Sequence, residues 1–205
     1  MNPEFLALSV VILLFSVIVH EVMHGFVALK FGDRTALNAG RLTLNPIPHV
    51  DPIGTILLPI FFLVFRTGFF IAWAKPVPIN PLNFNNIRKG ELFVSLAGVG
   101  SNFALAILGT IFYHLFSFNL LLQDIFQFTV GINLMLGVFN LLPIPPLDGS
   151  KVVLSQLPYH LAKEYEKMTS YGFLIILALL YFNILGLILS LILFPLHALL
   201  GVPPL

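Results

Sequence analysis

Four long apolar runs constrain this chain more than any other feature of its sequence. They cover residues 5–29, 92–116, 120–142 and 171–193. Each is long enough to cross a bilayer, because a spanning helix needs about 20 apolar residues. Only 9% of the residues are charged, whereas soluble domains carry about 25%. We therefore expect an all-α polytopic membrane protein with about four transmembrane helices, the fourth of which either continues or turns at residues 183–186, with 183–205 as a possible further short span.

A fifth apolar stretch, residues 53–73, is less suited to crossing because it contains Pro59, Arg66 and Gly68. If only the four runs cross, every lysine and arginine lies on one side of the membrane. If residues 53–73 crossed as well, the basic residues would be divided between both sides. Since basic loops are retained in the cytoplasm, we expect this stretch to be re-entrant or interfacial. Both basic loops would then be cytoplasmic, in what we take to be a prokaryotic cell membrane.

The region between the first two runs has a mixed pattern. Residues 40–44 alternate between small or polar and apolar side chains, as a short strand does. Long helices are excluded by prolines at positions 46, 48, 52, 76, 78 and 81. We expect a small membrane-associated β-sheet or re-entrant hairpin within residues 33–81. We also expect a short surface helix at 157–167, and one domain over residues 1–205.

The first run contains the sequence His20-Glu21-Val22-Met23-His24, an H-E-x-x-H pattern. On a helix, positions i and i+4 lie on one face, so the two imidazoles can share one zinc ion. The intervening Glu21 can then hold a zinc-bound water and take its proton. Three ionisable residues within five positions of a lipid-spanning helix are costly, and the pattern therefore favours a catalytic metal site.

Other interpretations of this cluster make different demands on the sequence. A carboxylate-bridged di-iron site needs a second Glu-x-x-His, and none of the other glutamates is followed by such a histidine. A metal-ion transporter usually has internal repeats and polar residues in several spans, which we do not find. A buried polar cluster that holds helices together is a further alternative, whereas a catalytically silent scaffold with structural zinc would not need a base at Glu21. The net charge of +1 offers no strong basic field for nucleic acid.

A catalytic zinc ion needs a third protein ligand and one open position. The candidates are Asp148, Asp51, His49, Glu164 and Glu166. The third run and the first reach comparable depths at about 1.5 Å per residue. Prolines at 143, 145 and 146 then end the helix. An extended segment there could return Asp148 to the histidines, although Asp148 could also cap a helix that begins at Gly149.

Two separated motifs together resemble the site-2 protease family of intramembrane zinc metalloproteases. They are His20-Glu21-x-x-His24 in an early span and Asn140-x-x-Pro143-x-Pro145-x-Leu147-Asp148-Gly149 at the end of a later one. The segments 40–55 and 74–81 are also similar to the family. Residues 97–102 depart from it, because Val99 stands where the family often has proline, while Asn102 matches.

The resemblance implies Zn²⁺ held by His20, His24 and Asp148, with Glu21 as the general base. It also implies that Asn140 holds the substrate backbone, and we assign Asn102 to substrate binding as a possible oxyanion donor. The expected reaction is hydrolysis of peptide bonds within or near transmembrane segments of other membrane proteins. The chain resembles the compact form of the family, which lacks an inserted peptide-binding domain and an appended nucleotide-sensing domain.

Overall fold

The structure is a computed structural model that describes residues 3–57, 61 and 74–205. Three of its helices are long and apolar enough to cross a membrane: α1 (Pro3–Lys30), α4 (Ile87–Leu115) and α5 (Leu120–Asn140). A bent pair, α8 (Gly172–Tyr181) and α9 (Ile184–Leu200), meets the same criterion when the two helices are taken together. The predicted helical membrane architecture is thus confirmed with three to four spans. The predicted re-entrant stretch at 53–73 lies mostly outside the described residues.

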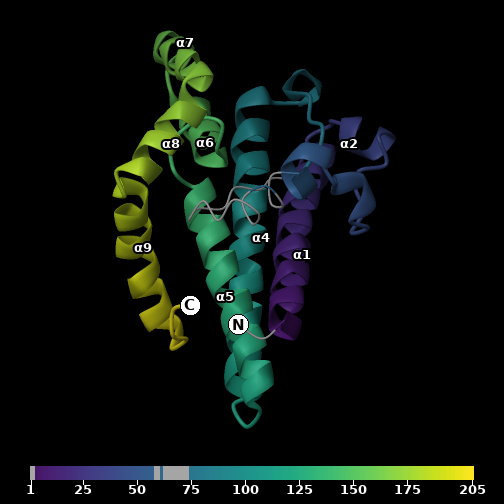
Figure 1. The fold of residues 1–205 in the computed structure, drawn as a ribbon. Coiled ribbons are helices and arrows are strands. Elements are labelled where there is room, and N and C mark those ends of the chain that lie inside the picture. Colours follow the sequence, from purple (N-terminus) through teal and green to yellow (C-terminus); the bar gives the residue numbers. More distant parts are fainter. Residues whose placement is uncertain (1–2, 58–60, 62–73) are drawn as a thin grey trace.

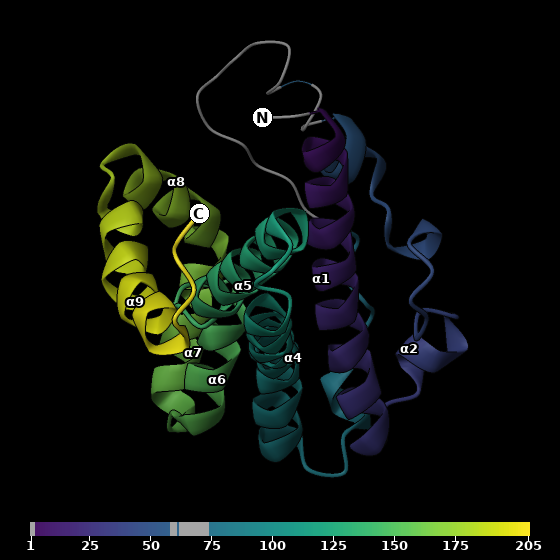
Figure 2. The same ribbon diagram turned by 90° about the horizontal axis from the view of Figure 1, so that it is seen from below.

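The three long helices stand side by side, with α4 in contact with both α1 and α5 (Figures 1 and 2). A small residue permits the close approach of α4 to α5, because a Cβ atom on Gly109 would lie 3.1 Å from Val130. Val130 belongs to a buried apolar cluster with Ala106, Leu134 and Val202. This cluster ties the C-terminal residues to the α4–α5 pair.

The axes of α8 and α9 differ by 82° at the break between them. Of the two alternatives at 183–186, continuation or a turn, the structure has the turn, where Asn183 adopts left-handed backbone angles with φ of 56°. Asparagine tolerates this conformation better than most residues. After the turn, α9 packs Leu185 and Leu189 against Val138 and Leu142, so the second half of the pair lies along α5 and continues beyond residue 193 to Leu200.

The prediction of a small β-sheet in residues 33–81 is wrong for the described part of that region. It holds only short helices, namely α2 (Thr35–Asn38), η1 (Ile47–His49), η2 (Pro52–Leu57) and η3 (Pro81–Asn83). The prolines withhold the N–H groups that a strand ladder requires. The two segments are joined by separate bonds instead: Arg41 Nη2 donates to the carbonyl oxygens of Lys75 and Pro76 at 2.7 and 3.2 Å, and the Lys75 N–H donates to the carbonyl oxygen of His49 at 2.9 Å.

After α5 the chain forms α6 (Asp148–Gln156), α7 (Tyr159–Lys167) and η4 (Met168–Ser170). The predicted surface helix at 157–167 is confirmed as α7, which buries none of its residues. The side chain of Arg88 fastens the end of α6 to α4, donating to the carbonyl oxygens of Ser155 at 2.6 Å and Leu157 at 2.8 Å. As a result, α6 lies at the same end of the bundle as α2 and the C-terminal end of α1 (Figure 1).

Candidate metal centre

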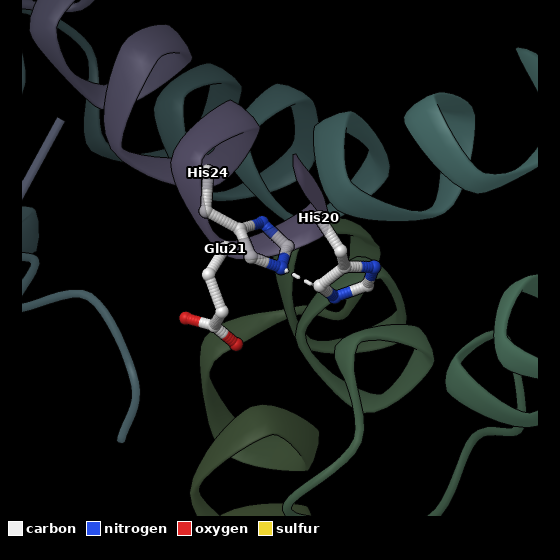
Figure 3. Close-up of side chains that lie close together, drawn as sticks. All are labelled: His20, Glu21 and His24. Carbon is white, nitrogen blue, oxygen red and sulfur yellow. Dashed lines mark hydrogen bonds between the residues drawn. The ribbon is translucent and has the colours of Figure 1, made fainter. Parts of the chain in front are cut away.

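His20 and His24 project from one face of α1, as the i, i+4 spacing predicts. Their Nε2 atoms are 2.9 Å apart, and Figure 3 shows the two rings meeting edge to face. Both residues are buried, with 7% and 6% of their surface exposed. Two imidazole nitrogens therefore face one small volume that is largely closed to solvent.

Asp148 brings a third donor atom into this volume from α6. Its Oδ2 atom lies 3.1 Å from His20 Nε2 and 3.0 Å from His24 Nε2. The chain reverses after α5 through a tight turn. The residue that follows Asp148 must be glycine, because a Cβ atom on Gly149 would collide with the carbonyl oxygen of Leu141. Asp148 is the first residue of α6 and Leu147 is its N-cap, so Asp148 does not cap the helix in the way its sequence position had suggested.

The carboxyl group of Asp148 is suited to bind a cation. Burial alone would raise its pKa, but the neighbouring side chains of His20, His24 and Lys151 hold the pKa well below its usual range. Lys151 Nζ lies 3.5 Å from Asp148 Oδ1. Asp148 is therefore a carboxylate at neutral pH.

The three donor atoms fit a zinc ion. Tetrahedral zinc with ligand bonds of about 2.0–2.1 Å separates its ligand atoms by about 3.3 Å, close to the 2.9–3.1 Å observed here. His24 Nδ1 lies 2.7 Å from the carbonyl oxygen of Val94. A carbonyl oxygen only accepts, so Nδ1 carries the proton and Nε2 keeps a free lone pair toward the other donors. Two histidines and one carboxylate leave a coordination position open.

The sequence profile of peptidase family M50 matches residues 117–182, which include Asn140 and Asp148. The chain is 40% identical over 179 residues to the putative zinc metalloprotease YwhC of Bacillus subtilis, covering 83% of this chain and 78% of that protein.

This chain belongs to peptidase family M50. The resemblance to the site-2 protease family is thereby confirmed. Membership agrees with the three to four candidate spans, and the M50 chain is a membrane protein.

Two archaeal relatives extend the comparison. The putative zinc metalloprotease MJ0611 of Methanocaldococcus jannaschii is 36% identical to this chain, over 74% of this chain and 73% of its own length. The zinc metalloprotease MJ0392 of the same organism is 27% identical over 98% of the M50 chain, which spans only 50% of that protein. No solved structure gives a significant match.

Glu21 lies beside the two histidines of the M50 chain, with ligand atoms of all three residues within 4.8 Å of one another. Figure 3 shows its carboxylate on the His24 side of the pair. The main-chain N–H of Val77 donates to Glu21 Oε2 at 2.8 Å. The neighbouring residues Pro76 and Pro78 have no N–H, so Val77 supplies the single main-chain donor of this tripeptide.

The two asparagines predicted to bind substrate differ in their surroundings. Asn140 ends α5 and is partly exposed, and its Nδ2 donates to the carbonyl oxygen of Leu136 at 3.0 Å. Asn102 is fully buried within α4. Its side chain contacts His20 Nδ1 at 2.6 Å and Asn133 Oδ1 at 2.9 Å. The structure thus places Asn102 against His20 and Asn133, away from solvent, and its assignment to substrate binding stays a prediction.

The remaining candidate ligands are engaged elsewhere. His49 Nε2 contacts the carbonyl oxygen of Thr43, and Asp51 accepts from the main-chain N–H groups of residues 53 and 54. Glu164 pairs with Lys167, and Glu166 is exposed.

Sequence reasoning missed one residue that shapes the centre. Gly98 is not among the predicted site residues, but a Cβ atom there would lie 2.5 Å from His24 Nε2 and 2.6 Å from His20 Nε2. The α4 backbone thus forms a wall of the site. The Gly98-x-Gly100 spacing alone carried no sign that one of these glycines faces both imidazoles.

Proposed function

We propose that this chain is a zinc-dependent endopeptidase that hydrolyses peptide bonds within or near transmembrane segments of membrane proteins. One observation carries the proposal: Nε2 of His20, Nε2 of His24 and Oδ2 of Asp148 converge to within 3.1 Å of one another, beside Glu21. Membership of family M50, and relatives whose names describe zinc metalloproteases, support the same assignment.

His20, His24 and Asp148 would hold the metal. A zinc ion bound there supplies a Lewis acid for the scissile carbonyl and lowers the pKa of water. The burial of all three ligands keeps bulk solvent from competing, and the anionic Asp148 offsets part of the charge of the cation. The anion and two neutral imidazoles are a donor set typical of catalytic zinc.

Glu21 would act as the general base and later as the proton donor to the leaving amine. The Val77 N–H holds Oε2 at 2.8 Å, so this bond orients the carboxylate and leaves Oε1 to accept a proton from the attacking water. A base must lie within hydrogen-bond reach of the proton that it takes, and this role is supported by the ligand atoms of Glu21, His20 and His24 lying within 4.8 Å of one another.

Asn140 would bind the substrate main chain. It is partly exposed at the end of α5, eight residues before Asp148, and its side-chain Nδ2 donates to the carbonyl oxygen of Leu136 within its own helix. An amide side chain can offer both a donor and an acceptor to a peptide. A peptide must be locally unwound to accept such bonds, because a membrane helix satisfies its own main-chain groups.

The proposed placement puts the site toward the cytoplasm. The described basic residues of the 30–89 and 151–167 regions lie at the end of the bundle that also holds α2, α6 and α7 (Figure 1). His20 and His24 lie in the half of α1 nearer that end. We propose that residues 1–205 form one metalloprotease domain in a prokaryotic cell membrane, with these loops in the cytoplasm.

The test is proteolysis by the purified, zinc-loaded protein in detergent, with a bacterial membrane-protein fraction as the substrate pool and mass spectrometry of new N-termini. We expect new N-termini inside or beside apolar segments for the native protein and for Glu164→Gln, an exposed control. Glu21→Gln should lower their yield at least 100-fold, because the base is removed while the metal ligands remain. Cleavage that survives Glu21→Gln would overturn the assignment, and zinc uptake into liposomes that survives it would favour transport.

A further inference from the structure

A continuous chain of buried side chains connects three helices to one of the two histidines. Asn133 Nδ2 of α5 contacts Ser16 Oγ of α1 at 2.9 Å and the carbonyl oxygen of Thr129 at 2.9 Å. Asn133 Oδ1 contacts Asn102 Nδ2 of α4 at 2.9 Å. Asn102 Oδ1 in turn contacts His20 Nδ1 at 2.6 Å. No more than 1% of the surface of Ser16, Asn102 or Asn133 is exposed.

The direction of every bond in this chain follows from its first acceptor. The carbonyl oxygen of Thr129 can only accept, so the Asn133 atom that faces it is the NH₂ group. The opposite atom of Asn133 is then an oxygen, which requires the NH₂ group of Asn102. Asn102 consequently presents its oxygen to His20, and because that oxygen only accepts, His20 Nδ1 must carry the proton.

We propose that Asn102 and Asn133, anchored on the Thr129 carbonyl and on Ser16, are positioning residues that hold His20 as the Nδ1–H tautomer. His20 Nε2 then keeps its lone pair toward Asp148 and His24. The other histidine reaches the same state in one step, since His24 Nδ1 donates directly to the carbonyl oxygen of Val94 at 2.7 Å. Both tautomers are therefore determined by main-chain carbonyls, one directly and one through two asparagines.

This arrangement also explains how an apolar helix bundle can bury two asparagine side chains. A buried amide without partners is destabilising, and a partly satisfied network is worse than an apolar core. Asn102 and Asn133 satisfy each other, and the residual groups end on Thr129, Ser16 and His20. Two leucines would fill similar space, but they would leave His20 Nδ1 without an acceptor and either tautomer accessible. The expected effect on zinc affinity rests on the proposed function, whereas the tautomer of His20 does not depend on it.

The experiment is ¹⁵N NMR of histidine-labelled, metal-free protein in detergent at a pH where the imidazoles are neutral, with His20 assigned by its loss in His20→Gln. We expect the His20 signals of a single Nδ1–H tautomer in the native protein. Asn102→Leu and Asn133→Leu should shift them toward the Nε2–H form or a mixture of both, while His24 stays unchanged. Ser95→Ala, a buried change on α4 outside the chain of bonds, should leave both histidines as they are.

Zinc titration supplies the second readout. Loss of a group that orients a metal-binding histidine typically costs about 10–100-fold in metal affinity, which we expect for Asn102→Leu and Asn133→Leu. A native His20 with its proton on Nε2, or a tautomer that Asn102→Leu does not change, would overturn the proposal even if the protein binds zinc. An Nδ1–H tautomer in a protein that binds no zinc would instead contradict only the proposed function.

Discussion

Gly98 lies on α4 opposite both imidazole rings, where even one methyl group has no space. A Cβ atom would be 2.5 and 2.6 Å from the two Nε2 atoms, distances at which something must move. The rings cannot retreat, because Asn102 and Val94 hold their Nδ1 atoms. The size of this residue is therefore part of the metal centre, although it offers no ligand atom.

Gly98→Ala is expected to lower zinc affinity at least 10-fold, because the methyl group takes the space between the ligand nitrogens and displaces the rings. Zinc content per purified chain and a competition titration measure the effect. Gly100→Ala is the matched control on the same helix, since a Cβ atom there meets nothing within 4 Å. Equal zinc binding by the two variants would show that α4 does not form a wall of the site.

Among the elements, the short helices after α1 depend on one buried carboxylate. Asp33 accepts hydrogen bonds from the main-chain N–H groups of Thr35 and Asn80 and from the side chain of Asn83. It thereby joins the beginning of α2 and the region of η3 to the end of α1. Val77 lies a few residues before Asn80, whose N–H group is bound to Asp33. Asp33 therefore also helps to place the Val77 N–H group that binds Glu21.

The stability of the protein should depend on pH through Asp33. Burial would raise the pKa of its carboxyl group, but hydrogen bonds from Thr35, Asn83 and Asn80 outweigh burial and lower the pKa below its usual range. A lowered native pKa stabilises the fold above the unfolded pKa of about 3.9. That stabilisation is lost as the pH falls from there through the native pKa.

Asp33→Asn should therefore destabilise the protein by about 1–3 kcal/mol at pH 7, because donors lose a charged acceptor. The difference from the native protein should shrink below about pH 4, where the native Asp33 is itself being protonated. Thermal unfolding in detergent between pH 3 and 7 measures both effects. Asp124→Asn, at an exposed position on α5, is the control. A constant difference across this range would mean that the charge of Asp33 does not stabilise the fold.

For the whole molecule, the bundle has two ends of different character. One end holds α2, α6, α7 and the lysines and arginines of the described regions, and the other holds the turn between α4 and α5 (Figure 1). Basic loops stay in the cytoplasm because they resist translocation. The candidate metal centre lies between α1, α4 and α6, and under the proposed orientation it lies nearer the cytoplasmic end of the bundle.

Single-cysteine labelling tests this orientation without background, because the chain has no cysteine. Phe118→Cys lies in the turn between α4 and α5, and Lys163→Cys lies on α7; both positions are exposed. We expect a membrane-impermeant thiol reagent to label Phe118→Cys in intact cells. Lys163→Cys should react only after the cells are opened. The reverse pattern would mean that the site faces the other side of the membrane.

The sequence alone was sufficient for features that depend on local periodicity and composition. Apolar runs of about 20 residues predicted α1, α4 and α5, and the i, i+4 spacing predicted that His20 and His24 share a face. The sequence marked 183–186 as the place where the fourth run either continues or turns, and the structure has the turn at Asn183. The sheet expected around residues 40–44 did not form, since the alternation of side chains could not reveal that Arg41 and Asp33 would bind the main-chain groups of the partner segment.

Only the tertiary structure decided which distant groups meet. Asp148 follows His24 by more than a hundred residues, and its approach depends on the reversal after α5 and on the attachment of α6 to α4 by Arg88. The sequence predicted substrate binding for Asn102 because a motif does not show which side chains will surround it. The packing of three helices places Asn102 in contact with His20 and Asn133. Local sequence specifies the helices and the chemistry on their faces, whereas contacts between distant faces arise from packing that no local pattern records.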